Sequence, residues 1–227
     1  LKPRILLIGG VGAGKTTLLR ILATLLIPAK GSVLVDGFDT IREMKEIRQR
    51  VGYMPEHFSL YQDLTVEENI KFFATLFNTT FEKGIDLVHD IYAQIEPFKN
   101  RRAGALSGGM KQKLALSCAL IHKPDILLLD EPTTSVDPVS RKEFWQMLQK
   151  LRSYNMTIIV STPYLDEIRQ CDHVAFIQKG LLKGIATPDE ILNKFVDIFY
   201  PAGLSHFNKE NIIGNSDDVI VVNDLCK

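Results

Sequence analysis

A glycine-rich segment, Gly9 to Thr16, constrains the fold of this chain more than any other part of its sequence. It reads G-G-V-G-A-G-K-T, follows the apolar run Ile5–Ile8 and precedes a helical pattern expected over residues 15–26. This is the context of a phosphate-binding loop, G-x-x-x-x-G-K-[ST], between a buried strand and a helix. Glycines let backbone N–H groups surround a polyphosphate at the helix N-terminus. The segment therefore predicts a nucleotide site in an α/β fold, and a glycine-rich turn that binds nothing is the alternative.

The loop predicts specific roles for its polar residues. Lys15 is expected to bridge the β- and γ-phosphates, and the hydroxyl of Thr16 is expected to ligate Mg²⁺. The residues expected to bind the nucleotide here are Gly9, Gly10, Val11, Gly12, Ala13, Gly14, Lys15, Thr16 and Thr17.

The composition limits the other partners of the chain. Its 227 residues suit one α/β domain with at most a fragment of another. Lys and Arg number 27 and Asp and Glu also number 27, so no overall basic field attracts nucleic acid or acidic membranes. The apolar stretch 18–29 is too short to cross a bilayer. Without metal-ligand spacing, Cys118, Cys171 and Cys226 are expected to be reduced thiols in a cytosolic protein.

Strand and helix patterns alternate along most of the chain. Strands are expected at 31–37, 51–54, 126–130, 157–160 and 174–177, with a hairpin partner at 181–185. Helices are expected at 41–50, from 66 behind an N-cap at Thr65, at 82–95, from 107 to 121, at 139–153 and briefly from 164. Alternation predicts a mostly parallel sheet with right-handed crossovers. The helices between 66 and 121 predict a helical lobe inserted into that core.

Further motifs connect these elements to a known family. Leu106 to Gln112 reads L-S-G-G-M-K-Q, Ile126 to Glu131 reads I-L-L-L-D-E, and S-V-D-P follows at 135–138. With the phosphate loop, and in this order, they resemble the Walker A, signature, Walker B and D-loop motifs of ATP-binding cassette (ABC) nucleotide-binding domains. The resemblance covers nearly all of residues 4–193. It implies an α/β P-loop NTPase (RecA-like) core with a mostly parallel sheet, a helical subdomain at about 66–121 and a truncated antiparallel β subdomain.

The family resemblance implies a role for each motif. In that family two cassettes pair head to tail, with Mg–ATP between the Walker A loop of one and the signature of the other. Asp130 would then hold the hydration shell of Mg²⁺, and Glu131 would be the catalytic residue that polarises the attacking water. Ser107, Gly108 and Gly109 would contact the γ-phosphate bound on the partner. A simple helix N-cap is the alternative for Ser107, and a solvated strand end is the alternative for the two acids.

Two positions depart from the family pattern. Glu56 replaces the usual glutamine of the Q-loop; its carboxylate can still ligate Mg²⁺ but adds negative charge near the triphosphate. Pro163 stands where the family has a histidine that contacts the γ-phosphate, and proline has no side-chain donor. His57, beside Glu56, is expected to be an exposed loop residue. We therefore expect this site to bind ATP well and to hydrolyse it slowly.

Two segments bear on the role of the whole protein. Residues 61–73 read Y-Q-D-L-T-V-E-E-N-I-K-F-F and resemble cassettes of ABC-2 exporters. This implies an ATP-hydrolysing transport subunit in the cytoplasm, held at the inner face of the membrane by a permease. Residues 217–227 resemble the first strand of a following cassette, or are an ordinary edge strand, and residues 194–216 are the expected linker. The candidate contacts with the permease, for which packing within the lobe is the alternative, are Phe58, Leu60, Tyr61 and Phe72.

Another class of protein carries similar motifs. Soluble ABC ATPases that act on ribosomes or DNA share the Walker and signature motifs, but usually add a charged helical insert, a zinc module or a basic extension. The sequence has no such feature and no net charge, so we expect no nucleic-acid partner. A P-loop kinase for small molecules leaves Leu106 to Gln112 unexplained.

Overall fold

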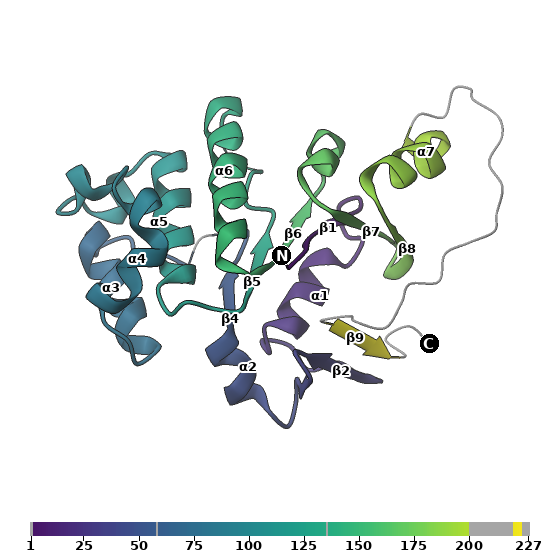
Figure 1. The fold of residues 1–227 in the computed structure, drawn as a ribbon, viewed down its shortest axis with the longest axis horizontal. Coiled ribbons are helices and arrows are strands. Elements are labelled where there is room, and N and C mark those ends of the chain that lie inside the picture. Colours follow the sequence, from purple (N-terminus) through teal and green to yellow (C-terminus); the bar gives the residue numbers. More distant parts are fainter. Residues whose placement is uncertain (1, 58, 135, 200–219, 224–227) are drawn as a thin grey trace.

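The central feature of the fold is a six-stranded sheet in the order β4-β5-β6-β1-β7-β8 (Figure 1). The structure is a computed structural model that describes residues 2–57, 59–134, 136–199 and 220–223. Neighbouring strands from β4 to β7 are parallel, and β8 pairs with β7 in the antiparallel sense. The expected α/β fold with a mostly parallel sheet is confirmed. The strands are β1 Arg4–Ile8, β4 Val51–Met54, β5 Ile126–Asp130, β6 Thr157–Thr162, β7 His173–Gln178 and β8 Leu181–Ala186.

Helices cover both faces of the parallel part of this sheet, whose strands β1, β5, β6 and β7 are mostly buried. On one face, α1 Lys15–Leu22 and α2 Met44–Arg50 pack against the sheet in a core that contains Leu19, Ile47 and Leu128. On the other face lie α5 Gly108–Leu120 and α6 Pro138–Leu151, whose Phe144 is fully buried among residues such as Leu127 and Leu129. All five residues of β5 are buried, as the apolar run predicted.

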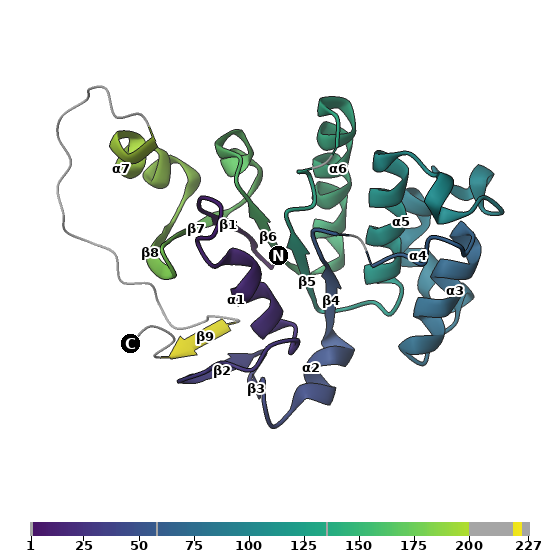
Figure 2. The ribbon, with the colours of Figure 1, turned by 180° about the vertical axis from the view of Figure 1, so that it is seen from behind.

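The expected helical lobe lies at the β4 end of the sheet (Figures 1 and 2) and contains α3 Val66–Leu76, α4 Phe81–Tyr92 and α5. Thr65 caps α3 through a capping box with Glu68, which confirms the predicted N-cap. Short 3₁₀ turns at Glu96–Phe98 and Ala103–Ala105 connect α4 to α5. Gly84 lets α4 approach α5 closely, because a Cβ at this position would collide with the carbonyl oxygen of Ile121.

Several element boundaries differ from the predicted ones. The first helix ends at Leu22 rather than near residue 26, since Thr24 takes a left-handed backbone with φ 58°. Residues 25–27 continue the apolar pattern that suggested a longer helix, but all three are exposed. The second helix begins at Met44 rather than 41. Strand β6 runs to Thr162, past the expected end at 160, and so reaches the site described below.

A smaller antiparallel sheet lies beneath α1 in Figure 1 and has the order β3-β2-β9. Its strands are β2 Ser32–Val35, β3 Phe38–Asp39 and β9 Ile220–Asn223. Strand β9 belongs to the segment expected to open a following cassette, and here it pairs with β2. Helix α7, Pro188–Phe199, continues into the segment expected as a linker, whose remaining residues lie outside the described part of the chain.

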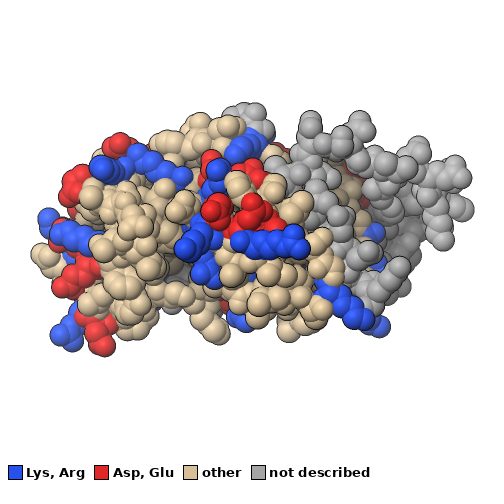
Figure 3. Space-filling model, turned by 90° about the horizontal axis from the view of Figure 1, so that it is seen from below, with Lys and Arg blue, Asp and Glu red and all other residues tan. Residues whose placement is uncertain are grey.

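The surface carries charges of both signs. In the face shown in Figure 3, acidic side chains gather near the centre and are bordered by Lys and Arg side chains. This mixture agrees with the equal totals of basic and acidic residues. Within the described ranges, no helix combines the length and the apolar character that crossing a bilayer would require.

Candidate nucleotide-binding site

The carboxyl ends of three adjacent strands bring the predicted site residues together. Strand β6 lies between β1, which leads into the phosphate loop, and β5, which ends on Asp130. In this register Ile8 is opposite Thr162, and Asp130 is opposite Ser161. Because the strands are parallel, their ends meet at one edge of the sheet, which is where ligands bind in open α/β sheets.

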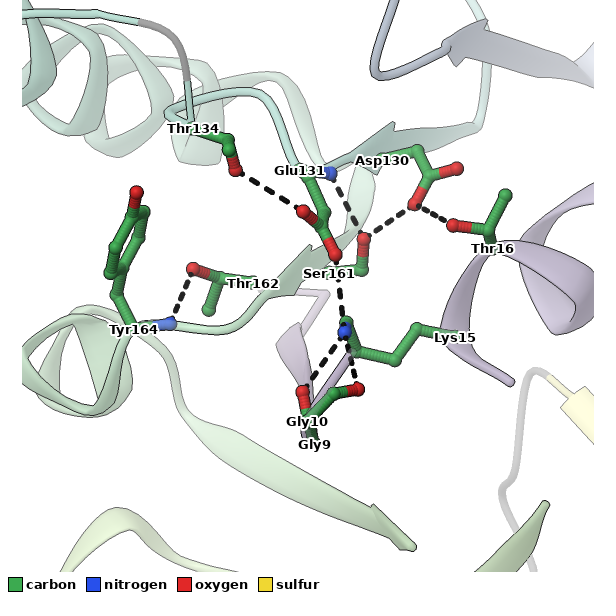
Figure 4. Close-up of polar contacts among 10 residues, drawn as sticks. All are labelled: Gly9, Gly10, Lys15, Thr16, Asp130, Glu131, Thr134, Ser161, Thr162 and Tyr164. Atoms are coloured by element: carbon green, nitrogen blue, oxygen red, sulfur yellow. Dashed lines mark hydrogen bonds and ion pairs between the residues drawn. The ribbon is translucent and has the colours of Figure 1, made fainter. Parts of the chain in front are cut away.

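Lys15 is at the centre of the cluster. Its side chain is 3% exposed, and its ammonium group donates to the carbonyl oxygens of Gly9 at 2.9 Å and Gly10 at 3.3 Å (Figure 4). The same Nζ atom forms an ion pair with Oε1 of Glu131 at 3.1 Å. Lys15 is therefore a buried cation whose present partners are loop carbonyls and one carboxylate.

Asp130 is fully buried and accepts hydrogen bonds from several hydroxyl groups. Thr16 donates to its Oδ1 atom at 3.1 Å and Tyr53 donates to its Oδ2 atom at 3.4 Å. Burial of the Tyr53 hydroxyl, together with the nearby negative charge of Asp130, raises the pKa of Tyr53 to about 12. Tyr53 therefore stays a neutral donor to Asp130 throughout the physiological pH range.

Ser161, which sequence reasoning missed, contacts both acidic residues. Its hydroxyl donates to Oδ1 of Asp130 at 2.7 Å and accepts from the backbone N–H of Glu131 at 2.9 Å (Figure 4). Thr134, also missed, donates to Oε2 of Glu131 at 3.3 Å. The available signal was a serine directly after the apolar run Ile158–Val160, but its meaning depends on the pairing of this strand with the Walker B strand, which the sequence does not show.

The loop itself has the backbone that a phosphate cradle needs. Gly12 and Gly14 have φ angles of 74° and 104°, which favour glycine, and Gly14 immediately precedes α1. The backbone N–H of Gly180, in the β7–β8 turn, donates to the carbonyl oxygen of Ala13 at 3.0 Å and so supports the loop from outside. Val11 is 97% exposed at the tip, and Thr17 is also exposed.

The signature residues lie elsewhere. Ser107 caps α5 by accepting from the backbone N–H of Met110 at 3.4 Å, so its simple N-cap role is present. Ser107 and Gly108 are exposed, and Gly109 allows close packing because a Cβ there would lie 2.7 Å from Oγ of Ser140. Helix α5 and helix α1 lie on opposite sides of α6 in Figures 1 and 2. The signature is therefore separated from the phosphate loop of its own chain.

The remaining predicted positions flank the cluster. Glu56 and His57 are exposed after β4, and no hydrogen bond or ion pair among the described residues joins Glu56 to Lys15, Thr16 or Asp130. Pro163 follows β6 directly. In the D-loop, Asp137 caps α6 by accepting from the backbone N–H groups of Val139 and Ser140, whereas residue 135 lies outside the described part of the chain.

The donor set fits a magnesium–nucleotide complex. Lys15 supplies a buried positive charge beside a helix N-terminus, which suits phosphate oxygens. Thr16 and Asp130 supply neighbouring oxygen ligands, and Mg²⁺ characteristically takes one or two protein ligands together with phosphates and water. Over the described residues, no group of three or more His, Cys, Asp or Glu side chains forms a metal site made by protein alone.

Comparison with known proteins places this geometry in context. The sequence profile of the family described as "ABC transporter" matches residues 2–134. The probable multidrug ABC transporter ATP-binding protein YbhF of Escherichia coli (strain K12) is 48% identical over 178 residues, which cover 78% of this chain and 31% of YbhF. The ABC transporter ATP-binding protein NatA of Bacillus subtilis (strain 168) is 40% identical over 185 residues, which cover 77% of this chain and 72% of NatA.

Solved structures agree with the sequence comparison. The ATP-binding subunit of an ABC transporter superposes with a TM-score of 0.75 at 26% identity, covering 86% of this chain and 82% of its own. The dimeric, post-hydrolysis ATP-binding cassette MJ0796 bound to ADP and Pi superposes with a TM-score of 0.72 at 25% identity. The match covers 82% of this chain and 85% of the MJ0796 chain. The chain spans about a third of the length of YbhF, with 31% of that relative covered.

Proposed function

Because this chain belongs to the ABC transporter family of ATP-binding domains, we propose that it binds and hydrolyses Mg–ATP in a head-to-tail pair of cassettes and thereby drives export across a membrane. The observation that carries this proposal is the cluster at the ends of β1, β5 and β6, where Lys15 pairs with Glu131 and Thr16 pairs with Asp130, each at 3.1 Å. The relatives described above carry transporter names, so action on ribosomes or DNA is not favoured.

Each residue of the cluster has a distinct task in this proposal. The phosphates of ATP take the place of Glu131 as the anionic partner of Lys15, which frees the Glu131 carboxylate to polarise a water molecule. Thr16 and Asp130 would hold the metal ion, Thr16 directly and Asp130 through the water shell of the ion. When bound, Mg²⁺ neutralises charge on the β- and γ-phosphate oxygens. Glu56 is a further candidate ligand on the Q-loop side.

The composite character of the site follows from the position of α5. The exposed N-terminus of this helix, with Ser107, Gly108 and Gly109, offers backbone N–H groups for a phosphate bound by another chain. The dimeric state of the related cassette MJ0796 supports this arrangement. A second cassette is therefore the partner we propose first, either as a second copy or in tandem, the latter supported by the resemblance of residues 217–227 to a first strand.

We further propose that hydrolysis in this site is slow. Pro163 cannot donate a hydrogen bond to the γ-phosphate, while Glu131, which would polarise the attacking water, is retained. Single-turnover hydrolysis of ATP by the wild type, Glu131→Gln and Pro163→His tests this idea. We expect a slow wild-type rate, no hydrolysis by Glu131→Gln and faster hydrolysis by Pro163→His. A wild type that is already fast, or a slow rate that Pro163→His leaves unchanged, refutes the proposal.

A membrane permease is the second partner we propose. Tyr61 and Phe72 pack edge to face, with ring centroids 4.6 Å apart, so both take part in packing within the lobe. They are also 49% and 39% exposed, which leaves part of each side chain available to a partner. Leu60 is buried, and Phe58 lies outside the described residues. The site would then operate in the cytoplasm at the inner face of the membrane. Co-purification with a polytopic membrane protein supports this assignment, and co-purification with ribosomes or DNA overturns it.

A further inference from the structure

We propose that Ser161 is a positioning residue that holds both acids of the hydrolytic site in their working orientations. The inference rests on the proposed Mg–ATP hydrolysis and adds to it a residue outside the Walker and signature motifs. Ser161 lies near the end of β6, the strand between the phosphate-loop strand and the Walker B strand. Its side chain is therefore placed between the two halves of the site.

The hydroxyl of Ser161 makes two hydrogen bonds, one as a donor and one as an acceptor, with two different residues. It donates to Oδ1 of Asp130 at 2.7 Å and accepts from the backbone N–H of Glu131 at 2.9 Å. Ser161 and Asp130 are both 0% exposed. A hydrogen bond to a carboxylate is stronger than one between neutral groups because the acceptor is charged, and burial strengthens it further because solvent is excluded. The hydroxyl therefore fixes the orientation of the Asp130 carboxylate.

Ser161 also fixes the unusual backbone of Glu131. Glu131 has φ 46°, a left-handed conformation that is unfavourable for a residue with a side chain. Its N–H group is shared between the Oγ atom of Ser161 at 2.9 Å and the carbonyl oxygen of Ser161 at 3.1 Å. This turn sends the Glu131 side chain toward Lys15 and Thr134, away from the direction taken by Asp130 (Figure 4). One hydroxyl thus determines where two consecutive acids point.

Loss of this hydroxyl should weaken binding of the metal ion more than binding of the phosphates. The remaining contact at Oδ1 of Asp130 comes from Thr16, which is itself a proposed metal ligand. Lys15 and the loop carbonyls do not contact Ser161 in the hydrogen bonds described above. We therefore expect Ser161→Ala to weaken activation by Mg²⁺ and turnover, while ATP binding in the absence of Mg²⁺ is preserved.

The matched control is another buried hydroxyl on the same strand. Thr157 begins β6 and is 0% exposed, and its Oγ1 atom has no hydrogen-bond partner among the described residues. It lies opposite Ile126, at the far end of β5 from the acids. Thr157→Val therefore removes an equally buried hydroxyl without changing the site. Ser161→Cys serves as a second test variant, because a thiol fills the same space but is a weak donor.

The experiment measures three quantities in the full-length protein: binding of a fluorescent ATP analogue without Mg²⁺, the Mg²⁺ concentration for half-maximal activity, and kcat for ATP hydrolysis. For Ser161→Ala we expect kcat to fall about 10- to 100-fold, as for the loss of a hydrogen bond to a charged group. We also expect the Mg²⁺ requirement to rise about fivefold or more by the same reasoning. Ser161→Cys should also lower kcat and raise the Mg²⁺ requirement, and Thr157→Val should match the wild type in both quantities.

The possible results separate this inference from the function on which it rests. Wild-type values for Ser161→Ala overturn the positioning role while the proposed ATPase stands. Equal losses in Ser161→Ala and Thr157→Val, or a loss of Mg²⁺-free nucleotide binding in the Ser161 variants, also overturn it in favour of a structural role. If Ser161→Ala does not fold, Ser161→Cys decides on the same criteria. A wild type that binds no ATP refutes the proposed function itself.

Discussion

Acidification should destabilise this protein through one half-buried imidazole, that of His122, whose two ring nitrogens are shielded from solvent. His122 follows α5 and stacks on Phe77 at the end of α3, with ring centroids 3.9 Å apart and planes inclined by 11°. Burial disfavours the charged form and lowers the pKa of His122 from 6.5 to about 4. In the unfolded chain the same residue regains its ordinary pKa. Between these two values the unfolded state therefore binds more protons than the folded state.

The sign and size of the effect follow from this difference. As the pH falls through about 6.5, His122 binds a proton in the unfolded chain but not in the folded protein. The proton therefore stabilises the unfolded state, and the free energy of unfolding decreases. Between pH 7 and pH 5 this linkage removes about 2 kcal/mol from the free energy of unfolding. The loss keeps growing as the pH falls toward the folded-state pKa of about 4, where the folded-state group is half protonated, and it levels off about one pH unit lower.

The assay is urea unfolding of the wild type and His122→Phe at pH 7 and at pH 5. Phenylalanine keeps an aromatic ring against Phe77 and cannot titrate, so other acid-sensitive groups contribute equally to both proteins. The wild type should lose about 2 kcal/mol more than the variant across this interval. Equal losses in the two proteins would refute an uncharged His122 whose ring nitrogens are shielded from solvent beside Phe77.

Three further substitutions test packing and binding. Gly84→Ala should lower the free energy of unfolding by about 1–3 kcal/mol despite the better helix propensity of alanine, because its Cβ meets the backbone of Ile121; greater stability in urea would contradict the close helix contact. Asn69→Ala should cost about 2–4 kcal/mol in the same assay, because the buried Asn69 amide accepts from the backbone of Tyr61 at 2.9 Å and donates to three carbonyls; a neutral effect would mean that the loop before α3 does not depend on it. Lys15→Ala should weaken binding of a fluorescent ATP analogue by about 100-fold or more through loss of charge-assisted contacts; wild-type affinity would place the phosphates elsewhere.

The parts of the structure that follow from local pattern were predicted well. The apolar run of β5 gave a buried strand ending on Asp130, and Thr65 gave the capping box of α3. These features depend on residues close together in the chain, where periodicity and capping chemistry are strong. The end of α1 was wrong, because Leu25 and Ile27 maintain the apolar pattern after the left-handed Thr24 has already ended the helix.

The site was predicted in part, for a related reason. Motifs point to residues expected to bind a ligand, so Lys15 and Asp130 could be proposed as site residues without knowing the fold. Ser161 and Tyr53 act on Asp130 instead, and their contacts arise from the order β4-β5-β6-β1 in the sheet. A sequence pattern predicts that these strands exist but not which of them are neighbours. The sequence pattern therefore could not identify residues that support the site through strand pairing.

The separation of the α5 N-terminus from the phosphate loop has a consequence for mixed assemblies of the proposed pair. If Lys15 of one subunit and Ser107 of the other are altered, both defects fall in one of the two sites and the second site is intact. If both changes are made in the same subunit, each site receives one defect. The two arrangements contain identical substitutions in identical numbers. Co-expression of differently tagged subunits would therefore give complementation: activity is retained when the two changes are in different subunits and is reduced in both sites when they are in the same subunit.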